Sequence, residues 1–244
     1  MRIAVIGGTG RIGTQVVGTL KAAGHDAVPH ARSTGVDLLT GEGLARALAG
    51  AEVVVDVTQS PTTDDSATAF FRTATGNLLA AAEQAGVGHV VLLSIVGVDR
   101  APGLGYYRAK VHQEDIVKAG PIPFSIVRAT QFFEFVEEVM SWTADGGTVR
   151  LPSTPVQPIA AADAARAVAD AATGKPLDGV RDVAGPDVFP LDELGRITLA
   201  ARGDGRTVTT DSTAGPFAAV QGDAIIARGD ARIAATRYRD WLTG

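Results

Sequence analysis

The chain has 244 residues, 45% of them hydrophobic, with a formal net charge of −5 and no cysteine. This length allows one large domain or two small ones, with a sizeable core. No basic block occurs, so nothing points to a nucleic-acid electrostatic footprint. The absence of cysteine excludes disulfides, thiolate metal sites and cysteine nucleophiles, and it fits a reducing compartment. The four histidines lack the paired spacing of metal ligands, so we expect no metal site.

The start of the chain is expected to be a strand of the fold and not a targeting segment, because its apolar run is too short for a signal peptide. No later apolar run reaches the length of a membrane helix. We therefore expect a cytoplasmic protein that engages neither a membrane nor nucleic acid.

The first thirteen residues, MRIAVIGGTGRIG, organise the expected fold. Residues 3–6 form a continuous apolar run, typical of a strand buried on both faces of a parallel sheet. Gly8, Gly10 and Gly13 follow in the spacing G-x-G-x-x-G, and an amphipathic helix then runs to Gly24. Here the first glycine allows a tight turn, the second lets a pyrophosphate approach the backbone, and the third lets helix and strand pack closely. The stretch predicts a dinucleotide site; a glycine-rich turn that binds no nucleotide is the alternative. The cofactor-binding residues expected in it are Gly7, Gly8, Thr9, Gly10, Arg11, Ile12 and Gly13.

The second strand, expected at residues 27–31, indicates which dinucleotide binds. An NAD site usually carries Asp or Glu near the end of this strand for the ribose 2′-hydroxyl. This chain has Arg32 and Ser33 there instead. A guanidinium suits a 2′-phosphate, so we expect NADP, with NAD as the lesser alternative. Arg11 would add a second positive charge, whereas a solvated Arg32 in a loop is the opposing interpretation. Pro29 lies within this expected strand but has no amide hydrogen to donate to a neighbouring strand, and the sequence does not explain its presence there.

Further strands and helices alternate along the chain. A short third strand is expected at residues 36–38, where Asp37 could reach the adenine edge. A fourth is expected at residues 52–57, with Thr58 and Gln59 at its ligand-binding carboxyl end. The other expected elements are a helix at 43–48, a helix ending near 85, strands at 90–95 and 124–127, and helices at 106–119, 131–142, 161–172 and 191–201.

This alternation predicts an α/β fold with a doubly wound parallel sheet of the Rossmann type. From residue 148 onward the expected strands are short and prolines interrupt the chain. We therefore expect residues 1–244 to form a single domain, in which about 148–244 is an extension that shapes a substrate-side cap.

A second pattern, Tyr106-x-x-x-Lys110, lies on an expected helix, where positions four apart share one face. Ser94 ends the preceding strand, so the three side chains can converge. A neighbouring ammonium favours the phenolate and lowers the pKa of a phenol, which lets Tyr106 act as a general acid. Ser94 would donate a hydrogen bond to a carbonyl oxygen as hydride arrives, and Lys110 would also hold ribose hydroxyls. In the alternative, Tyr106 packs in the core and Lys110 pairs with Glu114.

Together these patterns resemble the short-chain dehydrogenases/reductases of the extended or atypical kind, close to the NmrA-like branch. The resemblance implies a Rossmann fold with NADP or NAD in its crevice, and it implies catalytic roles for Ser94, Tyr106 and Lys110. Some NmrA-like members bind the dinucleotide as sensors and lack the tyrosine, which this chain keeps. Many relatives have Arg-Pro after the sixth strand, whereas this chain has Arg128-Ala129. The similar segments span essentially the whole chain and are GGTGRIG (7–13), HARS (30–33), GNLLAAAEQAGV (76–87), LLSIVGVD (92–99), YYRAK (106–110), SIVRATQFFEF (125–135), PIAAADAARAV (158–168) and DWL (240–242).

The segment after the strand at 124–127 is expected to face the substrate. Thr130 and Gln131 lie nearest the strand end, so we assign Thr130 to the cofactor and Gln131 to the substrate. Aromatic residues follow, and Phe132 and Phe133 are candidates for a pocket wall. Ordinary helix packing is the alternative.

The predicted function is that of an NADP-dependent oxidoreductase. It would transfer hydride to or from a small carbonyl, quinone or related small molecule, with Tyr106 as general acid and base. A non-catalytic NADP(H)-binding sensor that acts through a protein partner is the main alternative, and a nucleotide-sugar epimerase or dehydratase is a third. A monomer and a homodimer both fit the sequence.

Overall fold

The computed structural model describes residues 1–243, and the chain divides into two compact units. The first unit consists of Met1–Ser94, Gly105–Arg128 and Ala164–Arg181. The second consists of Ile95–Leu104, Ala129–Asp163 and Asp182–Gly244.

The main sheet has seven strands in the order β12-β9-β5-β4-β3-β1-β2. Strand β1 pairs in parallel with β2 on one side and β3 on the other, so the order reverses beside β1. Such a reversal is the switch point at which open α/β sheets bind their ligands. The strands are β1 (Arg2–Ile6), β2 (Asp26–His30), β3 (Val53–Asp56), β4 (His89–Ile95), β5 (Phe124–Ala129), β9 (Gly179–Ala184) and β12 (Arg232–Ile233).

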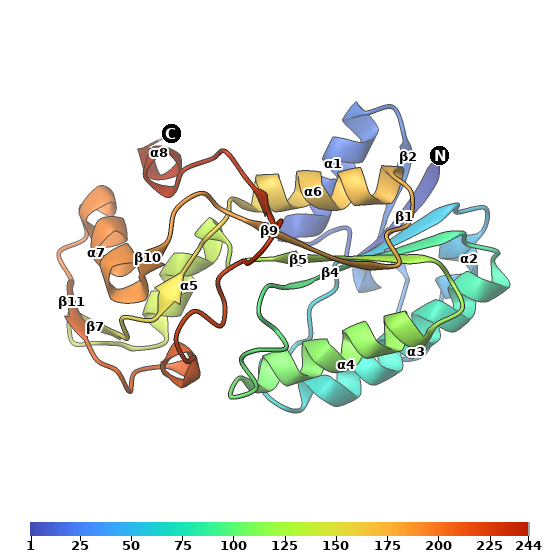
Figure 1. Ribbon diagram of the computed structural model, residues 1–244. Coiled ribbons are helices and arrows are strands. Elements are labelled where there is room, and N and C mark those ends of the chain that lie inside the picture. The colour runs from blue at the N-terminus through green and yellow to red at the C-terminus, as the bar shows by residue number, and fades with distance from the viewer. Residues whose placement is uncertain (244) are drawn as a thin grey trace. The chain divides into compact units, whose positions relative to one another are not determined.

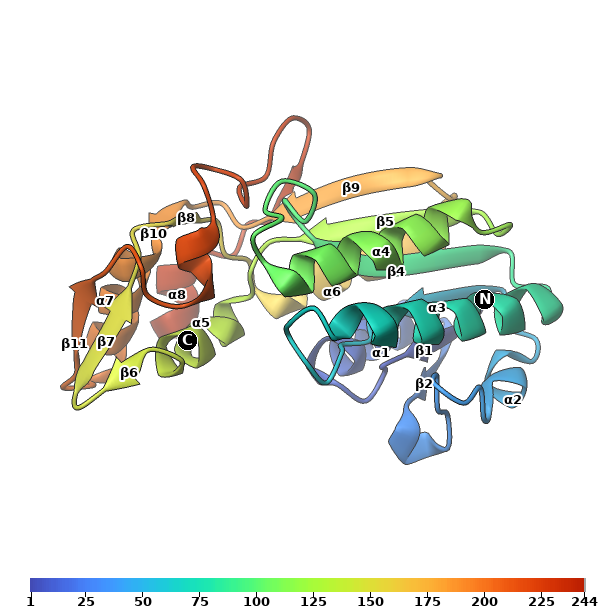
Figure 2. The same cartoon turned by 90° about the horizontal axis from the view of Figure 1, so that it is seen from below.

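Helices cover both faces of the sheet, as the predicted doubly wound fold requires (Figure 1). Figure 2 shows α3 and α4 side by side on one face, with α1 and α6 on the other. Helix α2 packs with α3 in the apolar core beneath them, where Leu48 and Leu78 are almost fully buried. The predicted fold class is therefore confirmed. The helices are α1 (Arg11–Ala22), α2 (Leu44–Leu48), α3 (Ala67–Gln84), α4 (Gly105–Ala119) and α6 (Ala161–Thr173), with a 3-10 turn at Arg32–Thr34.

The structure explains Pro29, which the sequence did not. Strand β2 is the edge of the sheet. Asp26 donates its amide to the Met1 carbonyl, and the His30 carbonyl accepts from Gly7, so the even-numbered residues of β2 face β1. Alternation turns the backbone nitrogen of Pro29 toward the open edge, where no donor is needed.

The strand expected at residues 36–38 is wrong, because the chain turns there. The Asp37 carboxylate accepts from the Leu39 amide at 2.8 Å, and the Asp37 amide donates to the Glu42 carbonyl. Asp side chains that bond the backbone two residues on make such turns. The amides of Val36 and Asp37 thus bond locally, and the Leu38 carbonyl accepts from the Asn77 side chain and not from a neighbouring strand.

The continuous helix expected at 131–142 is also wrong. The chain is extended at first, because Gln131 and Phe133 both hydrogen-bond the backbone of Ile159. A 3-10 turn (Phe133–Phe135) and the short helix α5 (Val136–Ser141) then follow. Pairing with Ile159 therefore overrides the helical pattern at its start.

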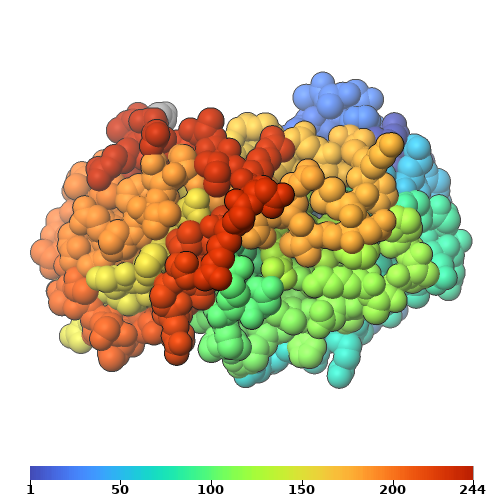
Figure 3. Space-filling view, in the orientation of Figure 1, coloured from blue at the N-terminus to red at the C-terminus, as the bar shows by residue number. Residues whose placement is uncertain are grey.

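The second unit has its own small sheets and an aromatic core. The Phe133 ring packs edge-on against Tyr238 at 5.0 Å, and the Tyr238 hydroxyl lies 2.7 Å from that of Thr198. In the space-filling view the chain after β11 covers part of this unit's surface (Figure 3). No helix within residues 1–243 combines the length and apolar character that a membrane crossing needs. The elements of this unit are β6 (Ala144–Asp145), β7 (Thr148–Leu151), β8 (Pro155–Val156), β10 (Phe189–Pro190), α7 (Leu191–Arg202), β11 (Thr207–Thr210), a 3-10 turn at Pro216–Ala219 and α8 (Tyr238–Thr243).

Candidate active site

The glycine turn between β1 and α1 is built by backbone atoms that pack too closely to admit side chains. Gly7 has φ +78°, which lets the chain reverse after β1. A Cβ at Gly13 would lie 2.1 Å from the Gly7 carbonyl oxygen, and one at Gly8 would lie 2.7 Å from the Pro29 Cα. The close packing predicted for the third glycine is therefore present.

Gly10 differs from its neighbours because it is exposed and a Cβ there would meet only one atom, at 3.3 Å. It stands at the N-cap of α1, where it has no side chain to cap the helix. Amide groups at a helix start attract phosphate through their hydrogens and the helix dipole. Thr9 and Arg11 beside it are exposed, and Ile12 is half-buried. The turn has the form that a pyrophosphate needs.

Arg32 and Ser33 follow β2 in an exposed 3-10 turn. The Arg32 side chain is 82% exposed, and its Nε lies 3.1 Å from the Asp37 carboxylate. Hydrogen bonds from the Leu39 amide above all, with help from the Thr40 amide and the Arg32 charge, hold the Asp37 pKa below its usual range. The guanidinium is therefore paired with an acid, yet open to a further anion.

Polar side chains gather beneath α4 at the carboxyl ends of three strands. The apolar core under α3 and α4 includes Val54, Leu92 and Ile126. Strand side chains alternate, so the residues two positions further on face the same layer. Those residues are Asp56, Ser94 and Arg128, and all are at least 90% buried.

Lys110, from α4, points into this layer. Its ammonium donates to the Leu93 carbonyl at 2.8 Å and to Gln113 Oε1 at 2.5 Å. Gln113 in turn donates to the Asp56 carboxylate at 3.0 Å. The other oxygen of Asp56 accepts from the amide and hydroxyl of Thr58, at 2.9 and 2.6 Å. Burial lowers the Lys110 pKa to about 8, against the opposing charges of Asp56 and Glu114.

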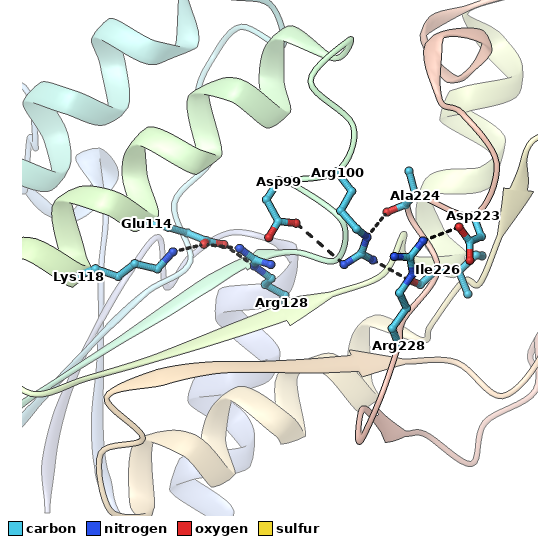
Figure 4. Close-up of polar contacts among 9 residues, drawn as sticks. All are labelled: Asp99, Arg100, Glu114, Lys118, Arg128, Asp223, Ala224, Ile226 and Arg228. Carbon is cyan, nitrogen blue, oxygen red and sulfur yellow. Dashed lines mark hydrogen bonds and ion pairs between the residues drawn. The ribbon is translucent and has the colours of Figure 1, made fainter.

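Glu114, one turn after Lys110, pairs with Arg128 and not with that lysine. Figure 4 shows its carboxylate between Arg128, at 2.7 Å, and Lys118, at 2.9 Å. Burial would raise the Glu114 pKa, but hydrogen bonds from Arg128 and Lys118 outweigh it and lower that pKa. The hydroxyl of Ser94, in the same layer, is buried and has no hydrogen-bond partner among the described residues.

Tyr106 begins α4 and is half-buried against Phe71, with the ring centroids 5.9 Å apart. Burial raises its pKa to about 12; the nearby Ser60 backbone opposes the rise, and the Asp56 charge adds to it. The Lys110 ammonium donates to Leu93 and Gln113, and the expectation that it lowers the Tyr106 pKa stays a prediction.

The loop after β3 connects the glycine turn to Tyr106. A Cβ at Gly7 would lie 3.0 Å from the Val57 carbonyl oxygen and 3.1 Å from the Thr58 amide, so the turn rests on the end of β3. Gln59 is exposed and Ser60 is buried. The Ser60 backbone, only two residues beyond Thr58, is one of the groups that affect the Tyr106 pKa. The predicted cofactor residues Thr58 and Gln59 therefore lie along the chain between the part of β3 that contacts the glycine turn and Ser60.

The remaining expected residues have separate settings. No hydrogen bond within the described chain joins Ser94, Tyr106 and Lys110 to one another. Thr130, Gln131, Phe132 and Phe133 belong to the second unit, where the Thr130 hydroxyl is buried and Phe133 is 1% exposed. This burial favours the packing alternative for Phe133.

Sequence reasoning missed two groups in this layer, the contact of Asp56 with Gln113 and the ion pair of Glu114 with Arg128. A signal was present in the strands, since a polar residue follows two positions after a core residue in each. The helix partners carry no comparable signal, because many exposed helices have Gln and Glu at such spacing.

The fold and the cradle define a class of dinucleotide-binding α/β proteins. Residues 7–174 match the NAD(P)H-binding family, and the chain belongs to it. The match confirms the expected NAD(P)H-binding family, and the fold is the one that the resemblance to short-chain dehydrogenases/reductases implies. A comparison with curated protein sequences found no match.

Solved structures share the fold at low sequence identity. The NADPH-dependent quinone oxidoreductase of Escherichia coli, solved with NADPH, is 17% identical with a TM-score of 0.75, over 99% of this chain and 98% of that one. A nucleoside-diphosphate-sugar epimerase from Staphylococcus aureus is 16% identical with a TM-score of 0.74, over the whole of both chains. The UDP-N-acetylglucosamine 4-epimerase from Bacillus cereus is 19% identical with a TM-score of 0.70, over 93% of this chain and 96% of that one.

Proposed function

We propose that the protein is an NADP-dependent oxidoreductase that transfers hydride to or from a small carbonyl, quinone or related substrate. The observation that carries this proposal is the packing of the glycine turn on the end of β3, from which the chain continues to Ser60, whose backbone affects the Tyr106 pKa. This arrangement would bring a phosphate-binding turn and a proton-bearing group to one edge of the sheet. The fold shared with a quinone oxidoreductase adds support.

The residues present fit a bound dinucleotide. The open helix start at Gly10 would hold the pyrophosphate, and Arg32 with Ser33 would hold the 2′-phosphate. When bound, the nicotinamide supplies or accepts the hydride. Tyr106 would donate a proton to the substrate oxygen during reduction and take it back during oxidation. Thr58 and Gln59 would contact the cofactor from the end of β3.

Residues of the second unit complete the proposal on sequence grounds. Thr130 would contact the cofactor, and Gln131, Phe132 and Phe133 remain the candidates for substrate contact. The single-domain organisation, and the role of about 148–244 as a substrate-side cap, likewise stay predictions.

A sensor without turnover is the second candidate. It is favoured by the environment of Tyr106, because burial raises its pKa to about 12 and so weakens it as an acid at neutral pH. In such a protein NADPH would bind the cradle with no hydride acceptor.

Measuring NADPH oxidation across a panel of carbonyl compounds and quinones separates the two. We expect turnover with at least one class and a loss of about 100-fold or more in Tyr106→Phe. Tyr107→Phe is the matched control, because it removes a phenol one position away. Tight NADPH binding without any turnover would favour the sensor. Unchanged turnover in Tyr106→Phe would refute the role of that residue.

A further inference from the structure

Gln113 lies between two buried side chains of opposite charge, Lys110 and Asp56. The lysine is 3% exposed and the aspartate 2%, and no ion pair joins them within the part of the chain that the structure describes. The Gln113 Oε1 atom accepts from the Lys110 ammonium at 2.5 Å, and its Nε2 atom donates to the Asp56 carboxylate at 3.0 Å. The carboxamide therefore connects a buried cation to a buried anion.

The chemistry at both ends fixes the direction of the Gln113 amide. A carboxylate can only accept hydrogen bonds and an ammonium can only donate them. The reverse orientation of the amide would place two acceptors together at Asp56 and two donors together at Lys110. The second oxygen of Asp56 is occupied by the amide and hydroxyl of Thr58, at 2.9 and 2.6 Å, so this carboxylate is held at the end of β3.

The remaining contacts of the Lys110 ammonium are uncharged. One hydrogen goes to the Leu93 carbonyl at 2.8 Å, and the Phe71 ring of α3 has its centroid 5.0 Å away. Of the three ammonium hydrogens, two have acceptors among residues 1–243, in Leu93 and Gln113. The third is left for the ribose hydroxyl of a bound cofactor, which is the contact that the sequence predicts for this lysine.

Among the charged groups of the layer, Asp56 is the anion that balances Lys110. Glu114, on the same helix, has its carboxylate 2.7 Å from Arg128, and these two charges offset each other. Tyr106, one turn earlier on α4, is neutral near pH 7, because burial raises its pKa to about 12. Burial lowers the Lys110 pKa to about 8; the Asp56 charge opposes this fall, and the Glu114 charge also opposes it.

We propose that Gln113 is a positioning residue for Lys110, which connects the ammonium to the Asp56 carboxylate and so keeps this lysine protonated beneath α4. The inference rests on the proposed function, in which a charged Lys110 serves the cofactor and Tyr106. The same carboxylate holds Thr58, whose amide would lie 3.1 Å from a Cβ at Gly7. One buried anion thus supports both the lysine and the strand end on which the glycine turn rests.

The test follows the ionisation of Lys110 in the whole protein, without cofactor or substrate. The four lysines of the chain are labelled with carbon-13 at Cε, whose NMR shift changes as the ammonium loses its proton. Lys110→Arg identifies the Lys110 signal by its absence. Asp56→Asn removes the negative charge, and we expect the Lys110 midpoint to fall by about one pH unit, a tenfold change. The half-exposed Lys118 should keep its midpoint and is the internal control.

A double variant exchanges the two groups. Asp56→Asn combined with Gln113→Glu moves the carboxylate next to Lys110 and the amide to the end of β3. That amide can still accept from Thr58, and it can donate to the new carboxylate, so the charges and hydrogen bonds are conserved in number. We expect the Lys110 midpoint to return to the wild-type value or to exceed it. A merely structural role for either side chain gives no reason for the second substitution to restore what the first removes.

Gln113→Met tests the connecting amide alone, because methionine has a similar length and no hydrogen-bonding amide. We expect the Lys110 midpoint to fall here too, since the ammonium loses an acceptor. This variant also replaces Asp56→Asn if that protein does not fold. An unchanged midpoint in Asp56→Asn or in Gln113→Met would overturn the proposal. A double variant whose midpoint stays a full unit below that of the wild type would overturn it as well.

Turnover is a separate readout. With a substrate found in the panel, the rate should fall at high pH as Lys110 loses its proton. Because a lowered pKa brings this loss to lower pH, the fall should begin about one pH unit earlier in Asp56→Asn and return to the wild-type pH in the double variant. If the wild type shows no turnover, the proposed function fails, while the carbon-13 titration still decides whether Asp56 acts on Lys110 through Gln113.

Discussion

The glycine turn and the polar layer under α4 lie at the same edge of the first unit but are built on opposite principles. The turn is backbone against backbone, and a Cβ at Gly13 would fall 2.1 Å from a carbonyl oxygen. The layer is made of long side chains, in which Lys110 and Glu114 each had several partners within reach. Steric exclusion therefore fixes the turn, whereas competition among hydrogen-bond partners fixes the layer.

Breaking the ion pair in the polar layer should have the largest effect. Arg128→Met leaves the Glu114 carboxylate, which is 1% exposed, with only the half-exposed Lys118. Removing one member of a buried pair costs about 3–5 kcal/mol. Urea denaturation measures the change in the free energy of unfolding. Lys118→Met is the control, and we expect it to cost less than about 1 kcal/mol because that partner is at the surface. Equal losses of stability in the two variants would contradict the conclusion that Arg128 stabilises Glu114 more than Lys118 does.

The glycine turn offers a matched pair within one helix. Gly13→Ala places a methyl group on the Gly7 carbonyl, and such overpacking costs about 1–3 kcal/mol. NADPH binding should fall with it, because the cradle must open to admit the methyl. Gly18→Ala adds the same group to α1 where no atom lies within 4 Å, and it should stabilise the helix by up to about 1 kcal/mol. Thermal melts and NADPH titrations check both. A Gly13→Ala protein that binds NADPH like the wild type would show that the turn tolerates side chains.

The same contrast explains what the sequence could predict. The crowded glycine turn could be predicted from the spacing of Gly8, Gly10 and Gly13, and the buried strands could be predicted from their apolar runs. Which way Lys110 points depends on Gln113 and Leu93, and no pattern in α4 distinguishes that direction from one toward Tyr106.

Local backbone bonding limited the prediction in a second way. The 36–38 strand failed because the Asp37 side chain makes a turn, and the helix start at 131 failed because Ile159 pairs with it. The first partner is a neighbour whose turn chemistry could have been recognised. The second is far along the chain, so a pattern confined to residues 131–142 cannot contain it.

A substitution of Arg32 tests whether the cofactor site extends from the glycine turn to the 2′-phosphate on the adenosine of NADPH. Removal of the guanidinium in Arg32→Ala should weaken NADPH binding about tenfold and leave NADH binding nearly unchanged, because only NADPH carries the 2′-phosphate. Asp37→Asn should strengthen NADPH binding, since it removes the acid that pairs with Arg32 at 3.1 Å. Fluorescence titration with both cofactors gives the ratio. Equal losses for NADPH and NADH would refute the role of the guanidinium.

The smallest effect concerns a polar contact at the other end of β4, away from the charged layer. His89 is buried and lies 2.9 Å from the Ser125 hydroxyl, which accepts from the Leu177 amide. Burial lowers the His89 pKa below 6.5, against the charge of Asp178. Below pH 6.5 the unfolded chain binds a proton that the folded chain resists, so stability should fall as the pH drops from about 7.5 to 5.

The control for this prediction must separate His89 from other titrating groups. The glutamine in His89→Gln stays neutral, so this variant should lose less stability as the pH falls. Part of the remaining loss comes from His30, whose pKa is also lowered by burial. The carboxylates with lowered pKa values, such as Glu114, begin to lose their contribution only near the acid end of this window, so they affect the upper part of the decline little. Urea unfolding at each pH gives the slopes for the two proteins. Identical slopes would mean that His89 exchanges its proton equally in both states, and burial at this end of the strand would then carry no penalty for the charged ring.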